Sequence, residues 1–254
     1  MLDSLKITIM RKSFIITLLF IFCYLSYAQH SLTEINYKVR NNIKVTEKLR
    51  TSDADFINNI SDEMEKLTYV LLFHNSESFF SLIEEMNADN GKYQPKSLGQ
   101  SFSFTGKVYT NYKEGIMLHE KYLSSDHFLI KSYIKDIGWE LSNETKNISG
   151  YTCYKAKTVD TIVTIRGLKT FEVIAWYAPK LPYSFGPANY TGLPGLILEL
   201  ETNKATFYAD KILFEQNHEI NLIKKPLKGK LISKDEYHEF ERKGFEKYKQ
   251  YIKN

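Results

Sequence analysis

The sequence predicts a mainly β protein of the α+β class: a curved antiparallel sheet meander with a packed C-terminal helix and a helix near residues 52–67. Short runs rich in β-branched and aromatic residues recur along the chain, and several of them alternate polar and apolar side chains. Turn-forming residues separate many of these runs. The composition includes 18 Tyr and 16 Phe, which supply the large side chains that such a sheet can bury.

The first 28 residues have the pattern of a secretory signal peptide. A basic pair at residues 11–12 precedes an apolar run over residues 14–25, and a small-x-small ending closes at Ala28. A bilayer span needs about 20 apolar residues, so the run is short for a membrane anchor. We therefore predict cleavage after Ala28 and export to the periplasm or the medium.

Residues 29–254 are predicted to form a single β-rich domain. The start of translation stays open between Met1 and Met10, because Met10 directly precedes the basic pair. Without the leader the chain has 31 basic and 29 acidic residues, a net charge of +2. Nucleic-acid binding requires clustered basic residues, so this balance argues against it. After the leader, no segment has the length and hydropathy of a transmembrane span.

The first half of the mature chain is predicted to contain one helix and several strands. Apolar side chains near helical spacing predict the helix over residues 52–67. Residues 107–113 and 116–122 are typical of a hairpin whose turn contains Gly115. The other strands predicted in this half cover residues 35–39, 68–73 and 128–133.

The second half is predicted to be a run of antiparallel strands joined by short reversals. Two strands are expected at residues 151–159 and 161–166, with a short turn at Asp160 between them. Arg166 and Gly167 provide the next reversal. The remaining strands are predicted over residues 139–141, 170–177, 193–201 and 206–214.

The C-terminal segment is predicted to be an amphipathic helix from Lys234 to Tyr251. Ser233 followed three residues later by Glu236 is the signature of a capping box at the start of a helix. Lys and Glu occupy the other face, which we interpret as a solvated surface. The apolar stripe consists of Tyr237, Phe240, Phe245, Tyr248 and Ile252.

The most distinctive stretch lies between two strong strands, at residues 179–195. It holds four of the six prolines together with three glycines, so it cannot continue a regular ladder and must form a shaped loop. Two interpretations stay open: an ordered binding surface, or a structural crossover whose rings fill one end of the sheet. The candidate binding residues are Trp176, Tyr183, Phe185, Tyr190, Leu193 and Pro194.

Gly192-Leu-Pro-Gly-Leu-Ile197 spells the motif for which the GLPGLI family of exported Bacteroidetes proteins is named. The chain also resembles this family in the flanking segments 150–156 and 175–179, and the resemblance covers roughly residues 149–201. It implies secretion and a β-rich fold. The family has no established biochemical activity, so the resemblance carries over no catalytic residues.

No catalytic residues, metal ligands or cofactors are predicted. The sequence lacks HExxH, GxSxG, Walker and CxxC motifs. Cys153 is the one cysteine after the leader; strand alternation favours a buried small side chain, with a reactive thiol as the alternative. His119 and His127 could approach across a hairpin, but Glu120 would face away from His119 and could not complete a metal site.

These observations predict a cell-envelope protein that is a non-enzymatic binding or interaction protein, with an envelope protein or an apolar ligand as its partner. A periplasmic carrier would hold the apolar ligand in the concavity of the sheet. An interaction module would instead dock its aromatic loop on a protein partner. A hydrolase with an unrecognised site is the third alternative, for which Glu199, Glu201 and Asp210 are the candidate acids.

Overall fold

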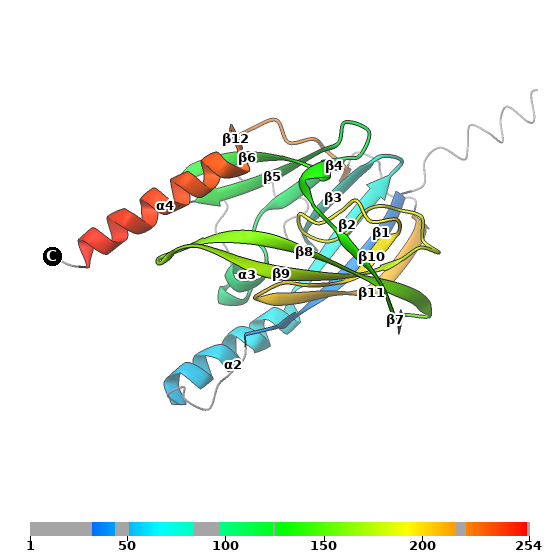
Figure 1. The fold of residues 1–254 in the computed structure, drawn as a ribbon, viewed down its shortest axis with the longest axis horizontal. Helices are drawn as coiled ribbons and strands as arrows, with labels where there is room; N and C mark the ends of the chain where they lie inside the picture. Colours follow the sequence, from blue (N-terminus) through cyan, green and yellow to red (C-terminus); the bar gives the residue numbers. More distant parts are fainter. Residues whose placement is uncertain (1–31, 44–50, 84–96, 124, 217–221, 253–254) are drawn as a thin grey trace, which may run out of the picture.

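The structure is a computed structural model and describes residues 32–43, 51–83, 97–123, 125–216 and 222–252. It is mainly β, with 52% of residues in strands and one large curved sheet (Figure 1). The predicted signal peptide lies outside the described residues. The strands are β1 (Leu32–Asn41), β2 (Thr68–His74), β3 (Glu77–Leu82), β4 (Lys107–Asn111), β5 (Ile116–Leu123), β6 (Asp126–Tyr133), β7 (Glu140–Ile148), β8 (Tyr151–Thr164), β9 (Gly167–Ala178), β10 (Leu196–Glu201), β11 (Ala205–Gln216) and β12 (Lys230–Ser233).

The sheet consists of two meanders that meet at β1. Its strand order is β12-β6-β5-β4-β3-β2-β1-β11-β10-β9-β8-β7. Strands β2 to β6 step away from one side of β1, and β7 to β11 return step by step to its other side. The chain crosses between the two halves after β6, through a short 3-10 helix, η2 (Ile134–Asp136). Neighbouring strands are antiparallel except that β12 pairs in parallel with β6, so the predicted antiparallel meander describes each half.

The turn predicted at Asp160 is wrong, because β8 continues through that residue as one strand. Each residue of β8 from Tyr154 to Thr164 pairs with β9 without a register shift. The reversal comes only after Thr164, where Gly167 adopts a φ of +114° that favours glycine. Asp160 therefore lies in the middle of a 14-residue strand, and its side chain is fixed by the sheet.

Both predicted helices are confirmed. Helix α2 (Thr51–Lys66) buries Ile60 and Met64 against the core, and the short helix α3 (Leu98–Ser103) packs beside it. Helix α4 (Lys234–Tyr251) starts at the predicted capping box: Glu236 accepts from the Ser233 amide at 2.7 Å, and Ser233 Oγ accepts from the Glu236 amide at 3.1 Å. No helix in the described part of the chain is long and apolar enough to cross a membrane.

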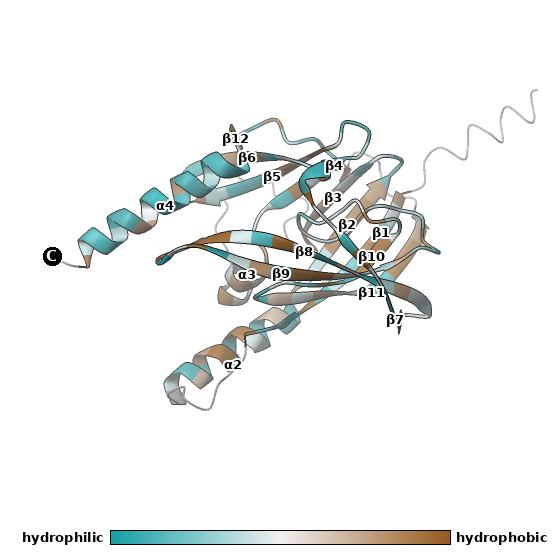
Figure 2. Ribbon diagram, in the orientation of Figure 1, coloured by the Kyte–Doolittle hydropathy of each residue, from teal (hydrophilic) through white to brown (hydrophobic). Residues whose placement is uncertain are grey.

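The core fills one face of the sheet around its centre, where β1, β2, β10 and β11 meet. Tyr37, Tyr69 and Phe207 are fully or almost fully buried there and form edge and stacked contacts with Phe80. Figure 2 shows hydrophobic residues along these central strands, whereas α4 is mostly hydrophilic. The aromatic side chains therefore pack mainly in the core that covers the sheet.

Helix α4 is packed only near its beginning. Tyr237 is buried against Phe128 of β6, whereas Tyr248 and Tyr251 at the other end are 56% and 81% exposed. In Figure 1 the second half of α4 projects from the body, and the β8–β9 hairpin extends in the same direction. The first turns of α4 thus bridge β6, β12 and β8.

Candidate functional site

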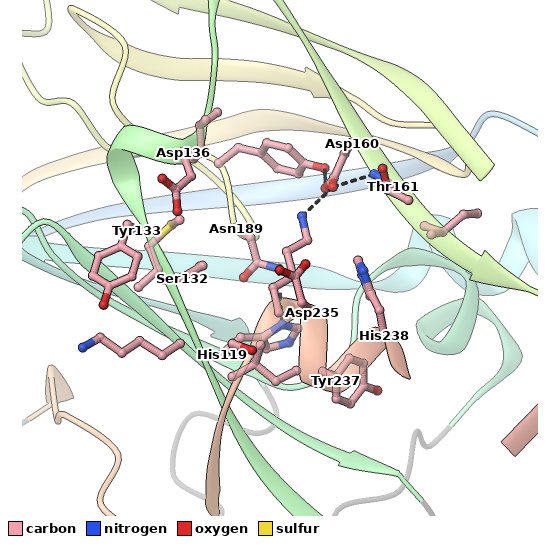
Figure 3. Close-up of a pocket in the computed structure, with 18 of the residues that line it drawn as sticks. His119, Ser132, Tyr133, Asp136, Asp160, Thr161, Asn189, Asp235, Tyr237 and His238 are labelled. Carbon is pink, nitrogen blue, oxygen red and sulfur yellow. Dashed lines mark hydrogen bonds and ion pairs between the residues drawn. The ribbon is translucent and has the colours of Figure 1, made fainter. Parts of the chain in front are cut away.

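A cleft of about 670 Å³ lies where the curvature of the sheet brings β5 and β6 opposite β8. One wall consists of residues 130–133 of β6, and the other consists of residues 158–163 of β8. The first turns of α4 cover it, and Asn189 and Tyr190 reach it from the β9–β10 loop, residues 179–195 (Figure 3). Segments far apart in the sequence therefore supply the lining.

Asp160 connects three of these segments. Its carboxylate accepts a hydrogen bond from Tyr190 of the β9–β10 loop at 2.8 Å and pairs with Lys234 of α4 at 2.5 Å. It also accepts from the backbone N–H of Thr161 at 2.7 Å. Burial alone would raise the pKa of Asp160, but Lys234 and the hydrogen bonds outweigh burial and lower it. The ionised carboxylate consequently fastens the loop and the helix to β8.

His119 lies at the base of the cleft in one fixed tautomer. Its Nε2 lies 2.8 Å from the carbonyl oxygen of Thr105, which can only accept, so Nε2 carries the proton and donates. Nδ1 then accepts from Asn189 Nδ2 at 3.2 Å. Phe104 stacks on the ring at 4.9 Å between centroids. Burial, with a smaller effect from Lys121, lowers the pKa of His119 to about 3, so the ring is neutral at physiological pH.

Lys121 brings a positive charge into the same cleft. Its side chain is 26% exposed, its ammonium lies 4.9 Å from the centre of the Tyr237 ring, and the Glu241 carboxylate is 3.8 Å away. Burial is the main reason that its pKa is lowered; Glu241 opposes this shift and Lys204 adds to it. Lys204 lines the cleft as well, so two lysines face the same space.

The sequence-predicted loop residues are divided between the core and the cleft. Phe185 and Leu193 are 3% and 1% exposed and belong to the main core. Tyr183 and Phe185 pack on Phe73, at 4.8 and 5.3 Å between ring centroids. Tyr190 is also buried in the main core, and its hydroxyl reaches the cleft and donates to Asp160. The interpretation in which rings fill one end of the sheet thus describes Phe185, beside which Leu193 is also buried, while Pro194 is exposed.

Trp176 and Glu199 lie together on the sheet, away from the residues that line the cleft. Lys146 of β7 reaches across to bond Glu199 at 2.8 Å, and its ammonium lies 4.3 Å from the centre of the Trp176 ring. Arg40 of β1 approaches the same carboxylate at 3.8 Å. Two cations therefore already neutralise Glu199, one of the three candidate acids for a hydrolase.

The other reactive side chains considered in the sequence are separated or buried. His127 bonds Glu120 at 2.8 Å on the face of β5 and β6 opposite His119, as strand alternation predicts. Among the described residues, no group of three or more His, Cys, Asp or Glu side chains could hold a metal ion. Cys153 is fully buried, and burial raises the pKa of its thiol to about 11.

Sequence reasoning missed Asp160, Lys121, Asn189 and Lys234 as site residues. Asp160 was assigned to a turn, which would have placed it at a strand end. The low strand propensity of aspartate favours a turn, and no local signal shows that the 14-residue strand continues through Asp160. The convergence of the other three depends on how the sheet curves, which local patterns do not determine.

A family described as "Protein of unknown function (Porph_ging)", found in Bacteroidetes, matches residues 164–199. This match covers β9, the β9–β10 loop and the first part of β10, so it includes the GLPGLI motif. It fits a GLPGLI-type family loosely and covers a small part of the chain. No curated protein matches the sequence.

Two solved structures of PNGF-II, in space groups C2 and P21, are similar to this chain at 13% identity. The TM-scores are 0.49 and 0.50, and the alignments cover 85% and 83% of this chain. They cover 32% and 33% of the PNGF-II chains, so this chain spans about a third of their length. At this identity the second match indicates a shared fold and gives no function.

Proposed function

We propose that this chain is a non-enzymatic binding protein of the cell envelope that holds a polar ligand in the cleft between β6 and β8. The observation that carries the proposal is the convergence of Lys121, Asp160, Asn189 and Lys234 on one cleft of about 670 Å³. Concave sites of this size with a few converging polar groups are where proteins most often bind small ligands.

The state of the titratable groups favours binding over catalysis. A general base needs a free lone pair at working pH, but both ring nitrogens of His119 are engaged. The Asp160 carboxylate already accepts from three donors. These groups are suited to fixing the shape and charge of the cleft.

The lining also favours a polar ligand over the apolar one that a lipid carrier would hold. Charged residues stand on several sides of the cleft, and transferring them from water to contact with hydrocarbon is costly. The concave core of the sheet is occupied by buried aromatic rings and by the β9–β10 loop. The cleft beside it offers space for a ligand.

Location in the envelope is supported by the leader pattern of residues 1–28. Fractionation of cells followed by mass spectrometry of the intact protein tests it. The expected N-terminus is Gln29, in the periplasmic or secreted fraction. Protein that keeps the leader and stays in the cytosol would contradict this part of the proposal.

Ligand binding is tested by native mass spectrometry of protein purified gently from the envelope fraction, together with thermal shifts for a panel of amino acids, sugars, nucleotides and short peptides. Wild-type protein should carry an adduct or be stabilised by one class in the panel. Ile162→Trp fills the cleft and should abolish the effect, whereas the control Leu227→Trp, at an 87% exposed position outside the cleft, should retain it. No adduct and no thermal shift in the wild type would overturn the proposal.

A further inference from the structure

The distal part of β8 presents an open strand edge to the cleft. Strand β7 pairs with β8 only as far as Glu140 opposite Lys157, whereas β9 pairs with the other edge as far as Thr164. Within the described residues, no strand covers the edge of residues 158–164 that faces away from β9. At about 3.3 Å per residue, this uncovered edge is about 20 Å long.

The lining of the cleft shows that this edge borders it. Six consecutive residues of β8, 158–163, line the cleft. Neighbouring side chains on a strand point to opposite faces, so a cleft on one face would contact only alternate residues. Contact with all six means that the cleft lies beside the strand, in the plane of its hydrogen bonds.

The backbone groups that face the cleft can be assigned. Thr164 pairs with Gly167 across a two-residue turn, so Thr164 and every second residue before it turn their N–H and C=O groups toward β9. The N–H of Thr161, which donates to the Asp160 carboxylate, therefore points toward the open edge. Because the N–H and C=O groups of alternate residues point to the same side of a strand, those of Val159 and Val163 point there too. These unpaired groups are a template for another strand.

The opposite wall of the cleft ends in a second open edge. Strand β12 covers β6 only from Phe128 to Lys131, so Ser132 and Tyr133 extend beyond it, and both line the cleft. The cleft is therefore a slot between two edges of one curved sheet. Helix α4 covers the slot and is fastened to β8 by the Lys234–Asp160 pair.

The charges at the base of the slot favour a carboxylate on the occupant. Lys121 and Lys204 face this space. Lys121 forms one loose ion pair, with Glu241 at 3.8 Å, and the other carboxylates of the lining are those of Asp136, Asp160 and Asp235. Asp160 is fully engaged with three donors and offers little to an incoming cation. An acidic side chain pointing inward would therefore gain an ion pair with lysine.

We propose that the slot binds a short extended peptide that adds as a strand to the edge of β8 at residues 158–164, with an acidic side chain directed at Lys121. The peptide would supply N–H and C=O groups to Val159 and Val163, and its inward side chains would face the base of the slot. This inference rests on the proposed function and specifies the ligand of the same site.

Fluorescence polarisation with labelled heptapeptides tests the proposal. The probes alternate threonine and valine around a central glutamate, glutamine or lysine, at 50 and 500 mM NaCl. Wild-type protein should bind the glutamate peptide about tenfold more tightly than the glutamine peptide at low salt, with the difference reduced at high salt. Equal binding of all three peptides would overturn the acidic specificity.

Two variants separate the backbone from the charge. Val159→Pro removes an N–H that faces the open edge and should weaken binding of every peptide at least tenfold. Val159→Thr keeps the N–H and should weaken binding at most about threefold. Lys121→Met should reduce the tenfold preference for glutamate over glutamine to less than about twofold. Normal peptide binding by a folded Val159→Pro protein would overturn strand addition.

Hydrogen exchange of wild-type protein gives a measurement that needs no variant. The glutamate peptide should slow exchange in residues 158–164 more than elsewhere in the sheet. If no peptide binds and small polar molecules still give thermal shifts that Ile162→Trp abolishes, strand addition is wrong and the proposed binding function stands. If neither class binds, both proposals fail.

Discussion

Two neighbouring parts of the β9–β10 loop differ in what surrounds them: the filled region is the core around Phe185, and the open region is the cleft beside Asn189 and Tyr190. Near Phe185 the loop is packed into the main core and bonded to the start of β10: Ile197 N–H donates to Phe185 C=O at 3.0 Å. Near Asn189 and Tyr190 it borders a cleft lined by charged groups. The part of the loop around Phe185 thus packs as part of the core, and the proposed ligand site lies beside it.

The largest expected effect comes from removing a ring from the filled region. Phe185→Ala leaves a cavity beside Phe73 and should lower the free energy of unfolding by about 3–5 kcal/mol. The control Leu227→Ala, at a residue that is 87% exposed, should change it by less than about 0.5 kcal/mol. Urea denaturation measures both. A loss below about 1 kcal/mol for Phe185→Ala would show that this part of the loop is not packed into the core.

Gly195 tests the same region through the backbone. It has a φ of +156°, and a Cβ there would lie 2.4 Å from the carbonyl oxygen of Ala178. Gly195→Ala should therefore lower the free energy of unfolding by about 2 kcal/mol or more, because backbone must move. Gly138→Ala is the control, since a Cβ there meets no atom within 4 Å. Equal free energies of unfolding for the two variants would contradict the close packing of Gly195 against the backbone of Ala178.

Periodicity in the sequence was sufficient for the fold class and for both long helices. Alternation and the capping box at Ser233 and Glu236 are local signals, and local signals survive folding when they agree with the core. The prediction of a turn at Asp160 is wrong because tertiary contacts outweigh the low strand propensity of aspartate. Asp160 pairs with β9 and forms an ion pair with Lys234. These partners are distant in sequence, so propensity could not reveal them.

The candidate site was missed for a related reason. The loop was selected because it is rich in aromatics, but burial of Phe185 and Leu193 depends on tertiary packing that composition does not encode. The cleft arises where β6 and β8, strands from different halves of the sheet, face one another. Only the curvature of the whole sheet brings Lys121 near Asn189 and Asp160.

His119 gives a pH test of the open region. Its pKa in the folded protein is about 3, below the ordinary value of 6.5, so folding favours the neutral ring. Stability from this group is complete above pH 6.5 and is lost as the pH falls toward 3, by about 1 kcal/mol over the first unit. His119→Gln can keep both hydrogen bonds without titrating, so its unfolding free energy should fall less between pH 6.5 and 5.5. Identical pH profiles would show that His119 is not held as a neutral ring.

The smallest expected effect on stability concerns the ion pair that fastens α4 over the cleft. Lys234 is 47% exposed, so Lys234→Met should lower the free energy of unfolding by less than about 1 kcal/mol. It should nevertheless speed hydrogen exchange in the first turns of α4, because Asp160 no longer holds them to β8. Lys243→Met, a control on the exposed side of the same helix, should leave exchange in those turns unchanged.

The acid dependence of this pair has a definite sign. Burial opposes it, but Lys234 and the hydrogen bonds lower the pKa of Asp160 below 3.8, so the stabilisation is present above pH 3.8 and is lost as the pH falls below it. Exchange in the first turns of α4 should therefore accelerate below that pH in the wild type and less so in Lys234→Met, after correction for intrinsic rates. If both proteins respond equally, the packing of Tyr237 holds the first turns of α4 without help from the ion pair. The cleft would then depend on side-chain packing, as the core around Phe185 does.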